Sequence, residues 1–541
     1  MHTSPTDGHA DVLIVGYGPV GQVLALQLAG RGWRVTVVER WRTGYPMPRA
    51  VAFDSEGARI LAAGLSIGER IGEIGEPSGD YTWKNAAGDA LLHIDVAERG
   101  RCGWPESTSM YQPALEAALV EQGATLPELT VIRGEEVVAV TDHGDRVEVT
   151  SRAPDGPERV HTASWVVGCD GANSFVRRGI GTAMADLGFS HDWLICDVLL
   201  HEERRFRPNN LQICDPQRPR TSVSAGPGHR RWEFMRAADE TVEELNTEKS
   251  AWRLLELFDV HPGNATLERF HVYSFSAAYA QTWRSGRLLL AGDACHVMPP
   301  FAGQGMTAGF RDVANLFWKL DAVLRGTAGE QLLDSYPVER RPHAKHAIQM
   351  SVNLGRIICQ TDPKAAADRD MVMLATAERP VTAAAAQQRS PLQPLTGGLL
   401  DLGEKGLKPV RPAGVLTPQG RVARGGRAGW FDEVVGEGFV LISTEDPAAQ
   451  LSDEDREFID TLGARLVRVL PQGADPHTAD EGAVVDTDGV YLPFLAETGS
   501  TAVLVRPDYY AFGGAADRAG LARLVAGLRA GLGAPAPSSA G

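Results

Sequence analysis

The sequence has little of what would tie it to a membrane, a nucleic acid or a secretory route. Among its 541 residues, no stretch approaches the ~18 consecutive apolar residues of a membrane span. Its formal net charge is −16, so we do not expect the basic surface that holds nucleic-acid phosphates. The first residues, MHTSPTDGHAD, lack the basic and apolar regions of a signal peptide, and we interpret them as a short disordered lead.

Cysteine is also scarce. There are six cysteines, and no two of them form a Cys-x-x-Cys pair. This spacing favours reduced thiols over a disulfide framework or a zinc site, so we expect a cytoplasmic protein without a metal centre. The apolar content of 43% and charged content of 23% are ordinary for a soluble globular protein, and the length predicts two or three domains.

The start of the chain predicts a nucleotide-binding βαβ unit. An apolar run at residues 12–15 predicts a buried strand, and the sequence GYGPVG follows at residues 16–21. Residues 23–28 predict a helix. A second strand, expected at residues 35–38, is closed by Glu39.

The glycines and the acid of this unit have distinct predicted roles. Gly16 would permit a tight turn, Gly18 would let the backbone approach a pyrophosphate, and Gly21 would let the helix pack on the sheet. The helix N-terminus would supply N–H groups to the phosphates. Glu39 has the spacing expected of a ribose-binding acid, and its charge disfavours NADP here. This unit alone does not decide whether the bound dinucleotide is FAD or NAD.

Two further motifs follow strand-like segments later in the chain. The sequence CDGANSFVRR occupies residues 169–178 and begins at the last residue of the run WVVGC. The sequence GDACHVMPPFAGQGMTAGFRD occupies residues 292–312 and follows the apolar run 288–291.

The second of these motifs suits a flavin. Asp293, at a strand end, could accept from a ribityl hydroxyl, while Gly303, Gly305 and Gly309 would let main chain lie close to a flat ring. Apolar residues recur at helical spacing from about Thr307. The N-terminus of this helix would direct its dipole at the flavin.

Together, the three motifs resemble those of the class A flavoprotein aromatic hydroxylases, which have the para-hydroxybenzoate hydroxylase fold. The resemblance covers roughly residues 10–350, and ICDPQRPRTSVSAGPGHRRWEFM at residues 213–235 is similar to the 3-(3-hydroxyphenyl)propionate hydroxylase branch. Thr307 and Cys295 depart from the Asn and Ala usual in the family. The resemblance implies an α/β fold: a Rossmann-like FAD-binding domain, an inserted β-sheet substrate domain and a C-terminal thioredoxin-like domain.

The expected domain boundaries follow from this fold. The FAD-binding domain would comprise residues 1–75, 102–182 and 284–395, the substrate domain residues 76–101 and 183–283, and the thioredoxin-like domain residues 408–541. The stretch TAAAAQQRSPLQPLTGG at 382–398 indicates a linker, and the tail APAPSSAG is expected to be disordered. The C-terminal domain contains no cysteine, which excludes thiol–disulfide chemistry there. We expect this domain to have a packing role or to take part in a homodimer.

The resemblance also implies a cofactor site. FAD would be resident, with NADH or NADPH as a transient co-substrate alongside dioxygen. No second GxGxxG is present, which fits a family that binds NAD(P)H without a separate Rossmann domain. The implied cofactor-binding residues are Gly16, Gly18, Pro19, Gly21, Glu39, Arg40, Arg49, Gln112, Asp170, Asp293, Pro300, Gly303, Gly305 and Met306.

The expected substrate is a small phenol. The predicted substrate residues are Tyr45, Ser222, Arg231, Phe234, Pro299 and Phe301, with Tyr273 and Tyr279 as further phenol candidates. The basic residues Arg218, Arg220, His229, Arg230 and Arg231 predict a cationic patch that would favour a hydroxyphenyl acid. Alternation along a strand leaves open that some of these charges face solvent instead.

The implied reaction is hydroxylation of the phenol through a flavin C4a-hydroperoxide. Because the cofactor carries this chemistry, we expect no catalytic nucleophile or metal, and we interpret His296 as structural. Two alternatives remain: a non-oxygenating FAD dehydrogenase, and an aromatic-binding flavoprotein without turnover. A flavin-dependent halogenase is disfavoured because the sequence has no W-x-W-x-I-P stretch.

Overall fold

A computed structural model describes residues 8–44, 49–376, 393–403, 406, 408–477 and 482–533. Tyr45, most of the predicted linker and the predicted disordered tail lie outside these residues. The predicted N-terminal lead is too long, because strand β1 (His9–Val15) already begins at His9.

The cofactor domain is built on a mainly parallel sheet. Its strand order is β17-β18-β11-β1-β2-β8, with β10 and β9 continuing from β11. The pairs β1–β2, β1–β11, β2–β8 and β11–β18 are parallel, as the buried apolar runs predict. The strands are β2 (Val35–Glu39), β8 (Leu129–Arg133), β9 (Glu136–Asp142), β10 (Val147–Arg152), β11 (Glu158–Gly168), β17 (Arg284–Ser285) and β18 (Leu288–Leu290).

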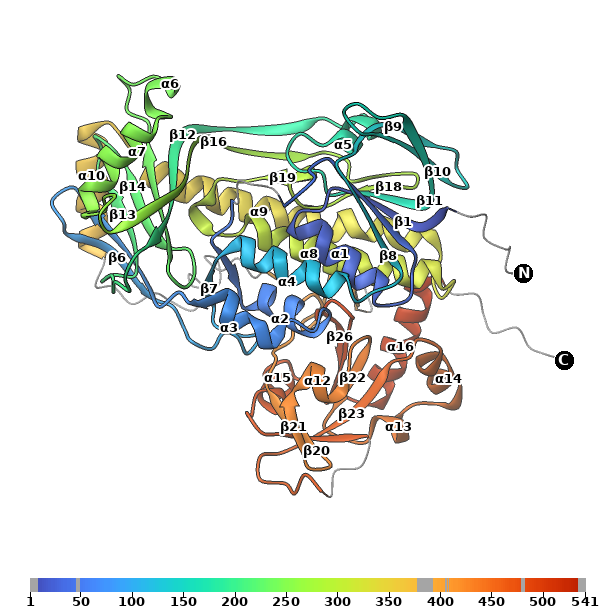
Figure 1. The fold of residues 1–541 in the computed structure, drawn as a ribbon. Helices are drawn as coiled ribbons and strands as arrows, with labels where there is room; N and C mark the ends of the chain where they lie inside the picture. The colour runs from blue at the N-terminus through green and yellow to red at the C-terminus, as the bar shows by residue number, and fades with distance from the viewer. Residues whose placement is uncertain are drawn as a thin grey trace.

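Helices flank this sheet, and two of them begin at the predicted cofactor loops. Helix α1 (Pro19–Ala29) follows β1, and helix α8 (Gly305–Leu324) packs beside it (Figure 1). The other helices of this domain are α2 (Ser55–Ala63), α3 (Ile71–Ile74), α4 (Gln112–Gly123), α5 (Phe175–Ile180) and α9 (Ser335–Ile358). A small sheet of β3 (Ala52–Asp54), β7 (Ser107–Met110) and β4 (Gly75–Pro77) lies near α2 and α3.

The substrate domain is a second sheet with the strand order β19-β16-β12-β15-β14-β13-β5-β6. Its two longest strands, β12 (Met184–Leu200) and β16 (Ala265–Ala280), pair along almost their whole length. The other strands are β5 (Asp80–Asn85), β6 (Ala90–Asp95), β13 (Asn210–Cys214), β14 (Arg220–Ser224), β15 (His229–Met235) and β19 (His296–Val297). The helices are α6 (Val242–Leu245), α7 (Glu248–Leu255) and α10 (Pro363–Thr376).

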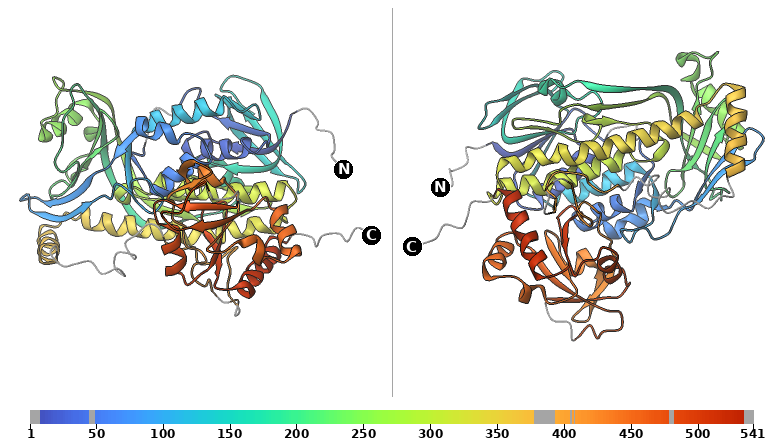
Figure 2. Two further views of the ribbon diagram at one scale, coloured as in Figure 1. Left: turned by 90° about the horizontal axis from the view of Figure 1, so that it is seen from below. Right: turned by 180° about the vertical axis from the view of Figure 1, so that it is seen from behind.

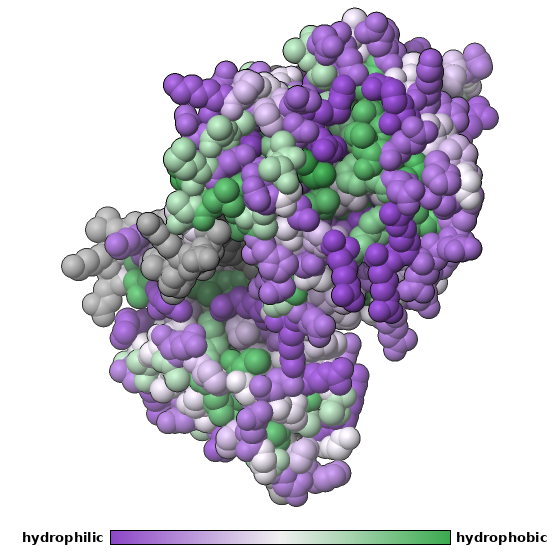
Figure 3. All heavy atoms as spheres, turned by 90° about the vertical axis from the view of Figure 1, so that its left-hand side faces the viewer, coloured by the Kyte–Doolittle hydropathy of each residue, from purple (hydrophilic) through white to green (hydrophobic). Residues whose placement is uncertain are grey.

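This second sheet has two differently covered faces. One face packs an apolar core with Leu194, Trp232 and Phe234 against α7. The other packs Trp193 with Phe301, Ile348 and Val352, so it is turned towards the cofactor loop and α9. Figure 2 shows α9 running beside both domains, and Figure 3 views the molecule from the side of the substrate domain, where hydrophobic residues lie among hydrophilic ones.

The C-terminal domain forms a separate lobe beneath the cofactor domain (Figure 1). Its sheet has the order β21-β20-β24-β23-β22-β25-β26. The strands are β20 (Arg421–Arg424), β21 (Arg427–Trp430), β22 (Val440–Ser443), β23 (Arg465–Leu470), β24 (Ala483–Asp486), β25 (Ala502–Val505) and β26 (Ala511–Ala515). The helices are α12 (Phe431–Val435), α13 (Pro447–Gln450), α14 (Asp453–Thr461), α15 (Tyr491–Glu497) and α16 (Arg518–Leu532). Its thioredoxin-like character stays a prediction.

A buried charge cluster joins this lobe to the cofactor domain. Arg506 contacts Glu339 of α9 at 2.6 Å and Asp508 at 2.5 Å. Lys319 of α8 contacts Glu339 at 2.9 Å, and the Asn315 amide donates to Asp508 at 2.7 Å. Buried ion pairs and a hydrogen bond therefore connect the lobe to α8 and α9, the two long helices that lie behind the cofactor loop.

The fold confirms the predicted α/β class, with a Rossmann-like cofactor domain and an inserted sheet. No described helix combines the length and apolar character that crossing a bilayer requires.

Candidate active site

A cleft of about 650 Å³ opens between the cofactor domain and the substrate sheet. Gln22, Ala50 and Gln112 line it from the cofactor domain. Asp197, Arg231 and Arg269 line it from the substrate sheet, so residues predicted for cofactor and for substrate share one space.

The glycine turn at the start of α1 leaves room for a phosphate group. Gly16 has a φ of +100°, and a Cβ there would lie 2.5 Å from the Cys169 carbonyl oxygen. A Cβ on Gly21 would collide with the Gly16 carbonyl oxygen, whereas one on Gly18 would meet nothing within 4 Å. Helix α1 starts with Pro19 and has no side-chain cap, so its first N–H groups face open space.

The N-terminus of α8 is similarly free for a ligand. Gln304 precedes the helix and makes no side-chain cap. Gly303 has a φ of +63° and open space beside it, and Gly305 has only Met298 nearby, at 3.9 Å from an added Cβ. Both glycines thus have the predicted clearance for a flat ring. Gly309 differs, because an added Cβ would lie 2.5 Å from Val20 of α1, so this glycine permits helix packing instead.

Arg49, Gln112 and Asp293 converge from three distant segments. The Arg49 guanidinium donates to Asp293 at 3.0 Å, and both side chains are partly exposed. The Gln112 carbonyl oxygen accepts from the backbone N–H groups of Arg49 and Ala50 at 2.9 and 2.8 Å. Gln112 therefore fixes the backbone that carries Arg49, while Asp293 keeps acceptor capacity for a hydroxyl.

The carboxylates of two predicted cofactor-binding residues, Glu39 and Asp170, accept hydrogen bonds from backbone N–H groups. Glu39 accepts from the N–H of Tyr17 at 2.7 Å and from that of Trp41 at 2.8 Å, which closes the turn after β2. Asp170 accepts from the N–H groups of Phe175 and Val176 and so caps α5. Burial raises the pKa of Asp170, although those hydrogen bonds oppose the shift.

The remaining predicted cofactor residues lie at the edges of this arrangement. The Arg40 guanidinium is exposed and lies 5.6 Å from the ring of Trp41. Pro300 is exposed in the loop before α8, and Met306 packs against the main core. Thr307 is fully buried with its methyl group towards Gly57 of α2, so this departure from the family pattern fills a contact between helices.

These residues fit FAD. Two uncapped helix N-termini, at α1 and α8, face clear space beside Gly18 and Gly303. Helix N-termini of this kind bind pyrophosphate and stabilise negative charge. Between them, Asp293 offers an acceptor for a sugar-like chain.

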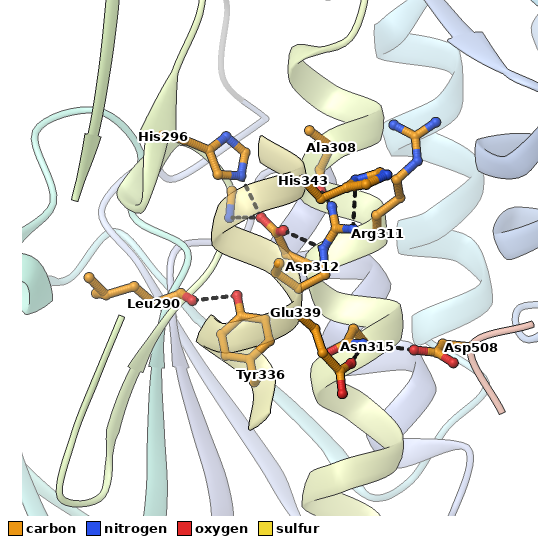
Figure 4. Close-up of polar contacts among 12 residues, drawn as sticks. Leu290, His296, Ala308, Arg311, Asp312, Asn315, Tyr336, Glu339, His343 and Asp508 are labelled. Carbon is orange, nitrogen blue, oxygen red and sulfur yellow. Dashed lines mark hydrogen bonds and ion pairs between the residues drawn. The ribbon is translucent and has the colours of Figure 1, made fainter. Parts of the chain in front are cut away.

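A buried polar network supports the loop from behind (Figure 4). His296 Nε2 lies 2.6 Å from Asp312 of α8, which also contacts Arg340 of α9 at 3.1 Å. Asp312 further accepts from the N–H of Gly292. Burial alone would raise the pKa of Asp312, but His296 and Arg340 together lower it. His296 is fully buried in this network, which supports the structural interpretation.

Aromatic residues form a buried cluster between the substrate sheet and α9. The Phe301 ring lies 5.7 Å from Trp193, 5.8 Å from Phe275 and 6.0 Å from Phe189. Pro299 is buried just before it. Phe301 thus joins the cofactor loop to this apolar cluster, and neither of these two predicted substrate residues is among those that line the cleft.

Ser222 and Phe234 lie on the opposite face of the same sheet. Phe234 belongs to the core beneath α7, and the Ser222 hydroxyl accepts from Arg230 at 3.3 Å. Successive side chains of a strand point to opposite faces, so Phe234 and Arg231 face opposite sides. Neither Ser222 nor Phe234 reaches the cleft, and the structure gives them a packing role in place of the predicted substrate contact.

The predicted cationic patch is largely neutralised. Arg218 contacts Glu240 at 2.7 Å, and Arg220 contacts Asp215 at 2.8 Å. Both arginines therefore belong to local ion pairs at the edge of the sheet. The sequence could not show this, because each partner depends on how the chain turns.

Arg230 and His229 are also engaged. The Arg230 guanidinium stacks 3.7 Å from the Phe206 ring, and burial lowers the pKa of Arg230 to about 10. The His229 ring stacks on Tyr111 at 3.8 Å, and its Nε2 lies 3.6 Å from Glu268. The basic residues of the predicted patch therefore make separate contacts on both faces of the substrate sheet.

Arg231 reaches the cleft, but with a carboxylate already bound. Its Nε lies 2.6 Å from Asp197, which Arg269 also contacts. Arg231 Nη1 donates to the Arg49 carbonyl oxygen at 2.5 Å, joining the sheet to the cofactor loop. Arg269 donates in turn to the Tyr273 hydroxyl at 3.1 Å.

Sequence reasoning missed Asp197, Arg269 and Glu233, which share the cleft side with Arg231. A signal was present, because Asp197 is the one charge in the apolar run Leu194–Leu200. A charge in a buried strand requires a partner. Its two arginine partners lie 34 and 72 residues away, and only the strand register brings them together.

Comparison with known proteins gives the same picture. A family model described as "FAD binding domain" matches residues 9–351, and one described as "HcaD C-terminal domain" matches residues 414–531. The chain is 36% identical to a "Probable NADH-specific resorcinol 4-hydroxylase" of Rhodococcus jostii (strain RHA1), covering 98% of this chain and 96% of the relative. It is 34% identical to a 3-(3-hydroxy-phenyl)propionate/3-hydroxycinnamic acid hydroxylase of Mycolicibacterium smegmatis, covering 93% and 90% respectively.

Solved structures share the fold over nearly the whole chain. Aklavinone-11 hydroxylase in complex with FAD and aklavinone matches with a TM-score of 0.75 at 24% identity, covering 98% of this chain and 100% of that one. OxyS anhydrotetracycline hydroxylase from Streptomyces rimosus matches with a TM-score of 0.75 at 25% identity and the same coverage.

The chain therefore belongs to the FAD-binding family of flavoprotein aromatic hydroxylases. It is an FAD-dependent monooxygenase that hydroxylates a phenolic substrate, with NAD(P)H and dioxygen as co-substrates.

Proposed function

We propose that the protein hydroxylates a neutral single-ring phenol of the resorcinol type and uses NADH as its reductant. The observation that carries this proposal is that Arg231 and Arg269, two of the guanidinium groups that line the cleft, both contact Asp197. A substrate carboxylate would have to displace this partner, whereas a phenol would not. The 36% identity to a protein named as an NADH-specific resorcinol hydroxylase supports both parts of the proposal.

The protein residues would bind and orient the two reactants. FAD, when bound and reduced, supplies the chemistry that inserts one oxygen atom from dioxygen into the ring. We propose that Gly16, Gly18 and the α1 N-terminus hold its pyrophosphate, that Asp293 holds its ribityl chain, and that the α8 N-terminus faces its ring. Phe301, which lies in the cofactor loop and packs on the buried Trp193, would help to exclude water from the phenol.

The test is a substrate panel on the FAD-loaded enzyme. Resorcinol, 3-(3-hydroxyphenyl)propionate and the amide of that acid are compared for stimulated NADH oxidation, and the products are identified by mass. We expect resorcinol to give the highest kcat/KM and the acid and amide to respond alike. A preference for the acid that is lost in Arg231→Met would refute the neutral-substrate proposal. A tenfold preference for NADPH would refute the choice of reductant.

Three further assignments belong to this proposal. A homodimer is supported by the exposed apolar residues Met371, Val372 and Leu374 on α10, and light scattering on the purified protein tests it. A cytoplasmic location is supported by six cysteines that are all free thiols. The predicted domain boundaries are supported by the separate sheets of the three parts, except that β19 and α10, which lie in the predicted FAD-binding segment 284–395, join the substrate sheet.

A further inference from the structure

Arg311 is a buried guanidinium group near the start of α8. Its side chain is 2% exposed, and each of its three nitrogen atoms has a partner. Nε donates to Glu56 at 2.6 Å, Nη1 donates to the Gln304 side chain at 2.9 Å, and Nη2 donates to Asp54. The cleft and the cofactor contacts described above do not involve this side chain.

Two of the three partners come from the start of α2. Asp54 is the N-cap of that helix, because its side chain also accepts from the N–H of Gly57 at 3.0 Å, and Glu56 lies in the first turn. Both carboxylates are buried. Gly57 in turn packs on α8, where an added Cβ would lie 3.0 Å from the methyl group of Thr307. Arg311 therefore joins the start of α2 to the start of α8.

The third partner belongs to the loop that we assign to the flavin. Gln304 is buried between Gly303 and Gly305, the two glycines with clearance for a flat ring. Its side chain makes no helix cap and is held by Arg311 instead. Arg311 thereby anchors the residue that precedes α8, and with it the backbone that would lie against the ring.

The formal charges of this group do not cancel, because the carboxylates of α2 share one guanidinium. The neighbouring Asp312 does not alter the balance, since it is turned towards His296 and is paired with Arg340 (Figure 4). Arg59, one turn further along α2, is paired with Asp432 of the C-terminal lobe. One formal negative charge is thus left behind the N-terminus of α8.

This group is near enough to the proposed flavin site to act on it. Arg311 follows Gly305 by six residues, which is roughly 9 Å along the helix axis, and its guanidinium reaches back to Gln304. At this distance one unit charge changes an equilibrium by roughly tenfold at the effective dielectric of a protein. Reduced flavin carries negative charge, so a charge here would shift the equilibrium between oxidised and reduced FAD.

We propose that Arg311 is a positioning residue for FAD, which anchors Gln304 beside the ring and offsets one of two buried carboxylates. Asp54 and Glu56 lower the reduction potential of the bound FAD, and Arg311 raises it. Hydride transfer from NAD(P)H adds two electrons and one proton to FAD, leaves NAD(P)⁺ and gives the flavin one negative charge. The cluster acts on this charge. The inference rests on the placement of FAD in the proposed function.

The test is the two-electron midpoint potential of the enzyme-bound FAD, measured by reductive titration against a reference dye. Glu56→Gln keeps the shape of the side chain and removes one negative charge. We expect its reduction equilibrium to become about tenfold more favourable, which is about 30 mV in the positive direction for a two-electron couple. Arg311→Met removes the positive charge, and we expect a shift of similar size in the negative direction.

The double variant Glu56→Gln/Arg311→Met separates charge from packing. It restores one formal negative charge without restoring the ion pair, so we expect its reduction equilibrium to return to within about twofold of the wild type. Packing damage alone would instead accumulate in the double variant.

The anchoring of Gln304 has its own readout. Arg311→Lys keeps the positive charge, but a compact ammonium group cannot place donors on three separate partners as the guanidinium does. We therefore expect Arg311→Lys to keep the wild-type potential and to weaken FAD binding by about 2- to 10-fold in equilibrium dialysis, the effect of one lost hydrogen bond. Wild-type FAD affinity in this variant would refute the anchoring role.

A matched control lies on the same helix. Lys319 is also buried and is paired with Glu339 at 2.9 Å, but it follows Gly305 by fourteen residues, about 21 Å along the axis. Lys319→Met removes the same charge at more than twice the distance, so we expect less than half the potential shift of Arg311→Met. Urea denaturation of both variants measures how much stability each has lost.

The outcomes separate this inference from the proposed substrate and reductant. Unchanged potentials in Glu56→Gln and Arg311→Met, or shifts of the same sign, overturn the role of the cluster, as does an equal shift in Lys319→Met. If Arg311→Met does not fold, Glu56→Gln decides alone: a positive shift supports the inference, and the absence of one overturns it. A panel in which no phenol stimulates NADH oxidation refutes the proposed function and leaves these potentials as they are. A protein that retains no FAD overturns both.

Discussion

The charge cluster between the cofactor domain and the C-terminal lobe should be essential for holding these parts together. Arg506→Met removes one of two positive charges from a group that also contains Lys319, Glu339 and Asp508. All four side chains are at most 2% exposed, so water cannot replace the lost partner. The variant would leave two carboxylates with a single ammonium group.

The expected cost follows from this imbalance. Breaking a buried ion pair by removing one partner costs about 3–5 kcal/mol, because the remaining charge stays buried. That free energy corresponds to an equilibrium constant lowered by roughly 10²- to 10⁴-fold. The effect should reach the cofactor, because Lys319 and Asn315 belong to α8, whose N-terminus faces the flavin site.

The assay is urea denaturation of the FAD-loaded protein, followed in parallel by circular dichroism and by FAD fluorescence. Arg529→Met is the matched control, because Arg529 lies in the same lobe at its surface: it is 25% exposed and contacts Glu454 and Asp455, which are 70% and 14% exposed. Exposed pairs contribute at most about 1 kcal/mol. If Arg506→Met shifts the midpoint no further than Arg529→Met, the cluster does not hold the lobe in the way that we describe.

The other predictions concern the cofactor, the reaction and the response to acid. Asp293→Ala should weaken FAD binding by about 1–3 kcal/mol, because a ribityl hydroxyl loses its acceptor, and equal FAD occupancy after dialysis would contradict the assignment. Labelled dioxygen should place one labelled atom in the product and one in water, whereas label drawn from solvent would exclude a monooxygenase. Burial alone would raise the pKa of Glu339, but the positive charges of Arg506 and Lys319 outweigh it and lower the pKa below its ordinary 4.5. Ionised Glu339 therefore stabilises the folded protein above that pH, and this contribution is lost as the pH falls. Glu339→Gln should therefore reduce the dependence of the urea midpoint on pH below about 4.5, and an unchanged acid profile would refute it.

Local patterns in the sequence predicted the elements that surround the proposed cofactor site. Strand, glycine turn and helix are adjacent in the chain, so the position of Gly18 at the start of α1 could be predicted from spacing alone. The same holds for Asp293 and for Gly303 before α8. These features depend on backbone geometry within a few residues, which local sequence determines.

The substrate half depended on information that a linear sequence does not carry. Arg231 and Phe234 are three residues apart, and only the face of the sheet that packs on α7 decides which of them reaches the cleft. If the assumed alternation of side chains is shifted by one residue, every side chain of the strand is assigned to the wrong face. The partners of Asp197 come from two other strands, so the charge balance near the substrate emerged only from the register.

The long ladder of β12 and β16 has a mechanical consequence. β12 is 17 residues long, roughly 55 Å at the usual rise per residue, and runs without a turn from near the cofactor loop to the far end of the substrate sheet. A continuous ladder of this kind acts as a stiff beam, so the two domains have no hinge between them along it. The register shifts only at Asp186/Ser190 and at Asp197/Val198 within this ladder. Bending of the beam would concentrate at these irregularities, and the second of them carries the carboxylate that Arg231 and Arg269 share.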